Sequence, residues 1–72
     1  MNLQQFYVKL GKRIKELREE KGYSQQILAE KADISIDYLG KIEVNINNPG
    51  LKSVFKIVRA LDISFEEFFK SI

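Results

Sequence analysis

The chain has 72 residues, a formal net charge of +2, and neither cysteine nor histidine. Its length allows one small domain over residues 1–72, and the two missing residue types exclude disulfide bonds and a zinc site as sources of stability. The composition, 44% hydrophobic and 31% charged, is that of a globular chain. No apolar run approaches the roughly 20 residues of a membrane span, so we expect a cytoplasmic protein with no membrane partner.

Spacing and capping residues predict the first two helices, over about residues 3–21 and 25–32. Apolar residues recur every three or four positions from Leu3 to Leu17, which is a helical stripe. Gly11 interrupts this stripe and would let another backbone approach, while Gly22 can take the left-handed conformation that ends a helix. Ser24 caps the second helix. The residues expected on the inner face of that helix are Ile27, Leu28, Ala29 and Ala32.

A short turn separates the second helix from a third, predicted over about residues 36–43. Asp33 lies in this turn and Ser35 caps the third helix, whose residues Leu39 and Ile42 point inward. Two helices joined by three or four residues, the second with a polar outer face, form a helix-turn-helix motif. The motif spans about residues 25–44, and a major groove about 12 Å wide admits such a second helix.

Two further helices are predicted over residues 51–72. They follow a turn-rich loop at residues 44–50, which holds the only proline. The fourth helix begins near Leu51, and Ser64 opens the fifth helix as part of a capping box with Glu67. Because no strand pattern competes anywhere, the fold class expected is all-α, with five short helices.

Several stretches of the chain agree in order and spacing with one known pattern. They read LGKRIKELREEKGYSQ, LAEKADIS, YLGKIE, NNPGLKSVFKIVRAL and DISFEEFF. Together they resemble the Cro/phage-repressor type of helix-turn-helix DNA-binding protein, also called the xenobiotic-response-element family. The resemblance covers roughly residues 10–69 and implies a five-helix, lambda-repressor-like DNA-binding domain that needs no cofactor.

Three positions depart from the family pattern. Asp33 stands where the turn usually has glycine, and Asn45 stands where glycine often ends the third helix. Asp and Asn tolerate the left-handed conformation best among non-glycine residues, at a cost of about 1 kcal/mol. Gly40 replaces the larger polar residue that is usual on the exposed face, which removes one side chain from the surface that would read bases.

The resemblance also implies roles for individual residues. Arg18 and Glu43 would form an internal ion pair that links the first helix to the end of the third. The positions that would face base edges are Ile36, Asp37, Gly40 and Lys41. A phosphate contact, which positions a protein on DNA, is implied for Gln25. The side-chain types and positions add further phosphate contacts, from Tyr38, Asn45, Asn47, Asn48, Lys52 and Ser53.

Most of these positions also allow a structural interpretation. Asp37 can accept from a cytosine amino group or stabilise the start of its helix through the helix dipole. Lys41 is either a guanine or phosphate contact or a solvated lysine, and Ile36 is either a thymine-methyl contact or a core residue. Tyr38 can pack sideways, although we favour a phosphate contact. Ordinary turn chemistry accounts for the three asparagines at least as well.

The end of the chain carries more aromatic residues than a small core needs. Apolar residues of the fifth helix follow i, i+3, i+4, i+7 spacing, and one terminal helix cannot bury them all. Because an exposed apolar patch commonly marks an interface, we expect a homodimer formed by the helices at about 51–72. The alternative is that these rings close the core of a monomer. The residues assigned to the interface are Phe55, Phe65, Phe69 and Ile72.

These features predict a sequence-specific DNA-binding transcriptional regulator that binds a pseudo-palindromic operator as a homodimer. Restriction-modification controller proteins and compact phage-type repressors are the subfamilies it resembles. The prediction includes no small-molecule ligand. An enzyme is disfavoured, because without histidine or cysteine catalysis would need carboxylates, lysine or tyrosine in a pocket. A protein-interaction module or antitoxin-like partner on the same scaffold stays open, since the net charge is small.

Overall fold

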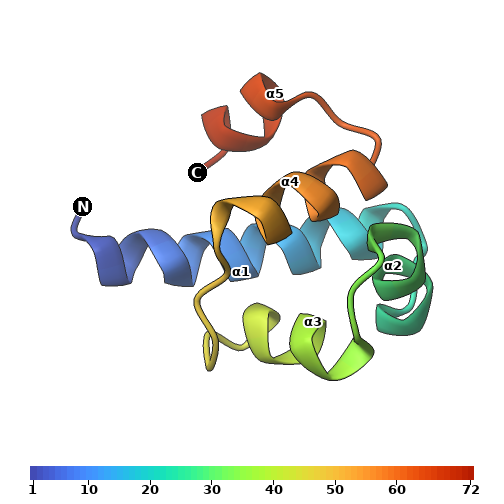
Figure 1. Cartoon of the computed structure of the whole chain (residues 1–72). Helices are drawn as coiled ribbons and strands as arrows, with labels where there is room; N and C mark the ends of the chain where they lie inside the picture. Colours follow the sequence, from blue (N-terminus) through green and yellow to red (C-terminus); the bar gives the residue numbers. More distant parts are fainter.

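The computed structural model describes all 72 residues and contains five α-helices and no strand (Figure 1). This confirms the all-α prediction. No helix has the length and apolar character that crossing a bilayer requires. The helices are α1 (Leu3–Glu20), α2 (Gln25–Ala32), α3 (Ile36–Glu43), α4 (Leu51–Ala60) and α5 (Phe65–Lys70).

The long α1 runs through the middle of the molecule, with the other helices arranged around it (Figure 1). Helix α2 contacts both α3 and α4, and α3 also contacts α1. Helices α3 and α5 lie on opposite sides of the layer that α1 and α4 form. One side of the domain therefore presents α3 and the other presents α5.

Serine hydroxyls begin three of the helices, as the sequence predicts. The hydroxyls of Ser24, Ser35 and Ser64 each accept a hydrogen bond from a backbone N–H three residues later, at 3.0–3.1 Å. Only the forward half of the predicted capping box in α5 forms, because the exposed Glu67 side chain does not bond back to the Ser64 amide. An exposed carboxylate already accepts hydrogen bonds from solvent water, so a bond to the Ser64 amide would add little stability.

Residues in the left-handed conformation end several elements. Gly22 has φ +74° after α1, and Asp33 has φ +56° in the turn between α2 and α3, so both predictions are confirmed. Asn45 follows α3 with φ +62°, and Asp62 follows α4 with φ +55°. Short polar side chains thus replace glycine at three sites, which is the substitution that the left-handed region tolerates best.

One cluster of buried side chains forms the core, and every helix contributes to it. Its largest fully buried members are Phe68, Leu10, Ile14, Leu28, Leu39, Ile42, Ile57, Leu61 and Val58. The prediction that Ile27 lies on the inner face of α2 is wrong, because its side chain is 43% exposed. The short α2 buries Leu28, Ala29 and Ala32, and these three already fill the side that contacts α3 and α4.

Gly11 lies buried where α1 crosses the end of α3. A β-carbon at this position would overlap the carbonyl oxygen of Ile42 and lie 3.3 Å from that of Glu43. The predicted close approach of another backbone is therefore present. It sets the spacing between α1 and the last turn of α3.

Candidate nucleic-acid interface

The exposed face of α3 forms an open hollow of about 340 Å³ together with the start of α2. Its lining residues are Gln25, Ile36, Asp37, Gly40, Lys41 and Val44. The structure thus brings the four predicted base-contact residues together. Val44 is an addition that the sequence reasoning missed, although its position four residues after Gly40 places it on the same helical face.

Two of these residues pair with each other. The Lys41 ammonium Nζ lies 3.0 Å from a carboxylate oxygen of Asp37, one turn earlier in α3, and both side chains are exposed. Exposed i,i+4 pairs stabilise a helix by only about 0.3–0.5 kcal/mol, so DNA can displace this pair at little cost. Both interpretations of Lys41, as a DNA contact and as a solvated lysine, are compatible with this weak pair. Asp37 gains a role that was not predicted, which is to neutralise that lysine.

Ile36 lies in the first turn of α3, and half of its side-chain surface is exposed, at 50%. The interpretation of Ile36 as a core residue is therefore wrong. Its predecessor Ser35 caps the helix, and Ile36 is one of the residues that line the hollow. The contact between Ile36 and a thymine methyl stays a prediction.

The start of α4 lies close to α3. The hydroxyl of Tyr38, on α3, donates to Oγ of Ser53 at 3.1 Å, while Lys52 is exposed beside it in sequence. The N-cap of α4 is Gly50, which provides no side-chain cap. Because the first N–H groups of a helix then have no protein partner, they are available to an anion.

The loop after α3 owes its shape to backbone hydrogen bonds. The amide of Asn45 donates to the carbonyl of Ile42 at 3.1 Å, and that of Asn47 donates to the carbonyl of Lys41 at 3.2 Å. These backbone contacts place both residues in the turn and leave the roles of their side chains open. Asn48 is exposed, whereas Oδ1 of Asn45 is buried without a hydrogen-bond partner. Phosphate contacts from the three asparagine side chains stay predictions.

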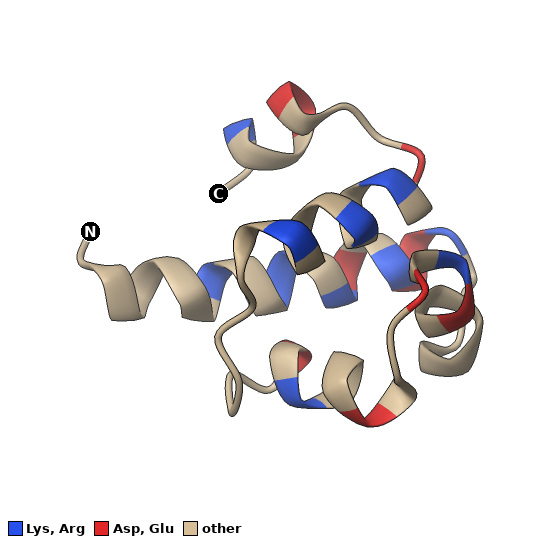
Figure 2. Ribbon diagram, in the orientation of Figure 1, with Lys and Arg blue, Asp and Glu red and all other residues tan.

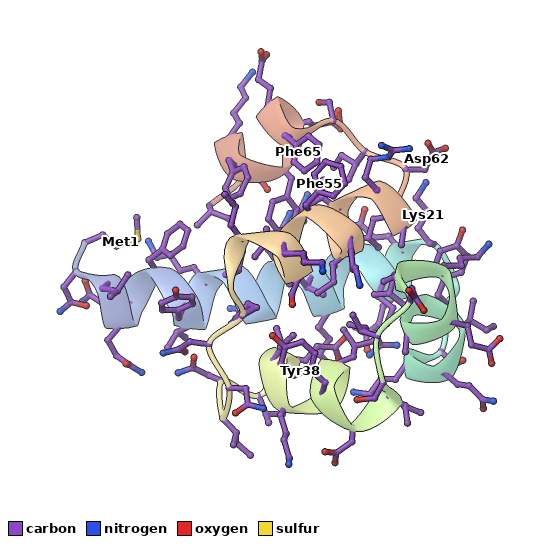
Figure 3. All side chains as sticks on the ribbon, in the orientation of Figure 1. Met1, Lys21, Tyr38, Phe55, Asp62 and Phe65 are labelled. Atoms are coloured by element: carbon purple, nitrogen blue, oxygen red, sulfur yellow. The ribbon has the colours of Figure 1, made fainter.

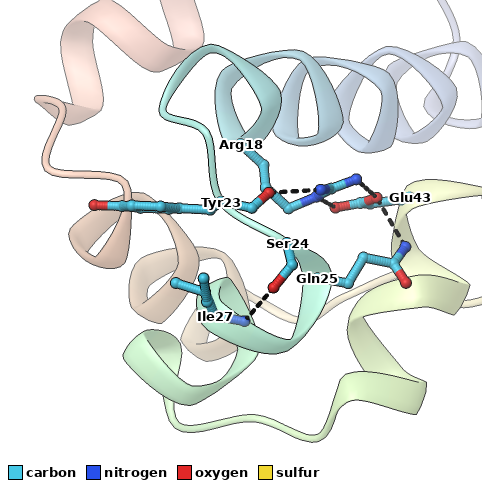
Figure 4. Close-up of polar contacts among 6 residues, drawn as sticks. All are labelled: Arg18, Tyr23, Ser24, Gln25, Ile27 and Glu43. Atoms are coloured by element: carbon cyan, nitrogen blue, oxygen red, sulfur yellow. Dashed lines mark hydrogen bonds and ion pairs between the residues drawn. The ribbon is translucent and has the colours of Figure 1, made fainter.

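A buried network joins α1, α2 and α3 (Figure 4). Arg18 donates from Nε and Nη2 to the two carboxylate oxygens of Glu43, at 2.8 and 3.0 Å, and from Nη1 to the carbonyl of Tyr23 at 2.8 Å. The ion pair expected between Arg18 and Glu43 is therefore present. The hydrogen bond to Glu43 raises the pKa of the Arg18 guanidinium above its ordinary value, against the opposing effect of burial.

Gln25 belongs to the same network. Its amide nitrogen Nε2 donates to Oε1 of Glu43 at 3.1 Å, and its side chain is half-buried. In this structure the Gln25 side chain lines the hollow beside the base-contact residues instead of standing apart from them. The phosphate contact expected from Gln25 stays a prediction.

Several basic side chains pair with acidic residues, and Figure 2 marks where the two kinds of residue lie on the ribbon. On α1, Arg13 lies 3.6 Å from carboxylate oxygens of both Glu16 and Glu20. On α4, Nζ of Lys56 lies 3.4 Å from the carbonyl oxygen of Asp33 and 3.9 Å from its carboxylate. This last contact, not predicted, ties the turn of the motif to α4. Charged side chains therefore hold the turn of the motif against α4 and also pair on the exposed face of α3.

An aromatic patch occupies the side of the molecule away from α3 (Figure 3). Phe55 and Phe65 stack with ring centroids 5.3 Å apart, and both are exposed, as is Phe69. Phe68 is fully buried and Ile72 is half-buried against the core. The domain thus closes its core with one phenylalanine of α5 and leaves the other two exposed. An adjoining apolar groove of about 180 Å³ is lined by Phe6, Tyr7, Leu10, Pro49, Leu51, Val54 and Phe69.

Comparison with known proteins agrees with this arrangement. The HTH_3 helix-turn-helix family model matches residues 14–68, and the chain belongs to this family. Among its relatives, the transcriptional regulator SinR of Bacillus subtilis is 46% identical over 56 residues, which cover 76% of this chain and 50% of SinR. The chain thus spans about half the length of the curated relatives it matches first.

Two restriction-modification controller proteins of known structure share the fold. C.AhdI from Aeromonas hydrophila superposes with a TM-score of 0.84 at 38% identity, covering 90% of this chain and 98% of C.AhdI. The C.Esp1396I tetramer in complex with its natural 35 base-pair operator gives a TM-score of 0.87 at 33% identity, covering 97% of this chain and 90% of that one. The five-helix architecture is therefore shared with both proteins over nearly the whole chain.

Proposed function

We propose that this protein is a sequence-specific DNA-binding transcriptional regulator that binds a pseudo-palindromic operator as a homodimer. The observation that carries the proposal is the exposed face of α3, where the four expected base-contact residues line one hollow. Membership of the helix-turn-helix family supports it. The operator complex of C.Esp1396I supports it further, and the likeness to this protein and to C.AhdI supports the restriction-modification controller proteins as its subfamily. We further propose that it acts in the cytoplasm.

In this proposal α3 enters the major groove and the start of α4 contacts the backbone. Ile36 contacts a thymine methyl, and Asp37 and Lys41 exchange their mutual ion pair for a cytosine amine and for guanine acceptors. Lys52 and the uncapped amides at the start of α4 hold phosphates. The buried network around Arg18 fixes the end of α3, so that the reading side chains approach the bases from a rigid helix.

The aromatic patch supplies the dimer interface in this proposal, so residues 51–72 serve dimerisation while residues 25–44 serve recognition. Figure 1 places α5 on the side opposite α3, which leaves the recognition helix free when α5 is covered. The longest dimension of one protomer is 31 Å. The proposal requires a two-fold pair that presents its two α3 helices at the separation of about 34 Å between successive major grooves.

The proposal is tested by selecting DNA from a randomised pool and measuring binding by fluorescence anisotropy over a salt series. We expect a palindromic consensus whose binding constant falls steeply with salt, with a log–log slope of about −0.9 per phosphate contacted. Failure to enrich any sequence at any salt concentration would refute the DNA-binding function.

Replacing Asp37 by alanine removes the carboxylate that neutralises Lys41. We expect binding to unrelated DNA to strengthen, because an exposed cation is released, while discrimination at one base pair falls by about 1–3 kcal/mol. Anisotropy with the selected operator, its single-position variants and unrelated DNA measures both effects. The matched control is Glu66→Ala, which makes the same charge change on α5, away from α3. Uniform weakening on all DNA would instead assign Asp37 only to the start of its helix.

Replacing Phe69 by glutamate places a charge in the exposed aromatic patch. We expect sedimentation velocity to show a monomer and the operator complex to become weaker, because burying an unpaired carboxylate at the interface is costly. The control Leu3→Glu introduces the same charge at an exposed apolar residue near the start of α1 and should leave the dimer intact. A dimer that survives Phe69→Glu would exclude this patch as the interface.

A second candidate function is a protein-interaction module or antitoxin-like partner. Exposed apolar side chains at the start of α3, at its end and just after it favour this function, namely Ile36, Val44 and Ile46, because such residues suit an apolar partner surface. Salt separates the two functions, since an apolar protein interface would show far less salt dependence than phosphate binding. The same anisotropy series therefore decides between them.

A further inference from the structure

The Gln25 amide has a defined orientation. Its neighbour Glu43 is a carboxylate that already accepts two hydrogen bonds from Arg18, and a carboxylate can only accept. The group of Gln25 that lies 3.1 Å from Glu43 must therefore be the donor, Nε2. The amide oxygen Oε1 then lies on the side away from Glu43 (Figure 4), and no group in the protein donates to it.

This oriented amide lies directly over Gly40 on the recognition helix. A β-carbon added at Gly40 would lie 3.7 Å from both Nε2 and Oε1 of Gln25, so the amide covers the position where a side chain is absent. Both residues line the hollow that also contains Ile36, Asp37 and Lys41. The free acceptor of α2 therefore belongs to the same surface as the exposed face of α3.

The chemistry of a free acceptor does not suit a phosphate. Phosphate oxygens only accept hydrogen bonds, so the amide oxygen of Gln25 has nothing to offer them. In the major groove, the hydrogen-bond donors on base edges are the exocyclic amines, N6 of adenine and N4 of cytosine. The second hydrogen of Nε2 remains available, and an amide that offers both an acceptor and a donor matches N6 and N7 of adenine.

We propose, on the basis of the DNA-binding function above, that Gln25 is a specificity-determining residue that reads an exocyclic amine of adenine or cytosine. Glu43 is its positioning residue, because its carboxylate fixes which amide atom is free. Gly40 gives the base edge access to the amide. The protein thus reads bases from α2 as well as α3.

The test uses the full chain and the operator selected from the randomised pool. Gln25→Met keeps the length of the side chain and removes both hydrogen-bonding groups. We expect it to bind that operator about tenfold more weakly and to lose the preference for adenine or cytosine at one position of each half-site. Its affinity for operators already changed at that position should equal that of the unsubstituted protein. The neighbouring Gln26→Met, whose amide contacts only Glu30, is the control and should change neither quantity.

A change on the DNA side keeps the test independent of how well the variant folds. The preferred base is replaced by its analogue without the exocyclic amine, purine for adenine or pyrimidin-2-one for cytosine. The unsubstituted protein should lose about tenfold in affinity for the analogue operator, and Gln25→Met should lose none.

Two results would overturn the assignment while leaving the regulator function intact. One is a uniform loss of affinity by Gln25→Met on all DNA, which would identify a phosphate contact. The other is equal sensitivity of the unsubstituted protein and Gln25→Met to the analogue. If the unsubstituted protein enriched no operator at all, the function itself would fail first.

Discussion

Replacing Arg18 by methionine is expected to lower the free energy of unfolding by about 3–5 kcal/mol, because it leaves a buried charge without its partner. The Glu43 side chain is only 1% exposed, and two of its three hydrogen bonds come from Arg18. Domains of this kind have a total free energy of unfolding of about 5–15 kcal/mol, so the expected loss is a large part of that total. Urea denaturation followed by circular dichroism measures the change.

Two further variants show whether the loss of stability comes from leaving Glu43 without Arg18 or from losing the ion pair itself. The double variant Arg18→Met with Glu43→Leu removes both charges and should recover most of the stability, because apolar replacement of a buried pair is often neutral or stabilising. Arg13→Met removes an arginine whose ion pairs involve exposed glutamates at 3.6 Å and should cost less than about 1 kcal/mol. An Arg18→Met variant as stable as Arg13→Met would show that Glu43 is rehydrated when its partner is removed.

Local patterns in the sequence were sufficient to predict the helices and the residues at which they begin and end. Ser24 and Ser35 accept from backbone amides three residues on, as capping residues do, and Asp33 takes the left-handed turn conformation between them. Leu39 and Ile42 are buried at the spacing that one helical face dictates. Each of these features follows a pattern within a few consecutive residues, so the sequence alone was enough to predict it.

Contacts between side chains from different helices could be identified only from the structure. The Gln25 amide meets Glu43 eighteen positions later, and the Tyr38 hydroxyl meets Ser53 fifteen positions later, so no local spacing relates the partners. Both side chains are long enough to reach a neighbouring helix as well as DNA, and only the packing of α2 and α4 against α3 shows which contact each makes within the protein. The Asp37–Lys41 pair is different, because its i,i+4 spacing was visible in the sequence.

Replacing Gly11 by alanine is expected to destabilise the fold by about 1–3 kcal/mol, because overpacking a close contact forces the backbone to shift. The added methyl would overlap the carbonyl oxygen of Ile42, and a main-chain atom inside a helix cannot move aside as a flexible side chain can. The loss has to exceed the helix-propensity gain of about 1 kcal/mol that alanine brings over glycine. Thermal and urea unfolding measure the net change.

Gly40→Ala is the matched control, since it makes the same substitution inside another helix of the same domain. Its β-carbon would meet only the Gln25 side chain, at the ordinary contact distance of 3.7 Å. The propensity gain should therefore dominate and raise the stability by about 0.5–1 kcal/mol. The two variants are thus expected to change stability in opposite directions, and the difference measures how closely α1 approaches α3. If Gly11→Ala were as stabilising as Gly40→Ala, the close approach at Ile42 would not be maintained in solution.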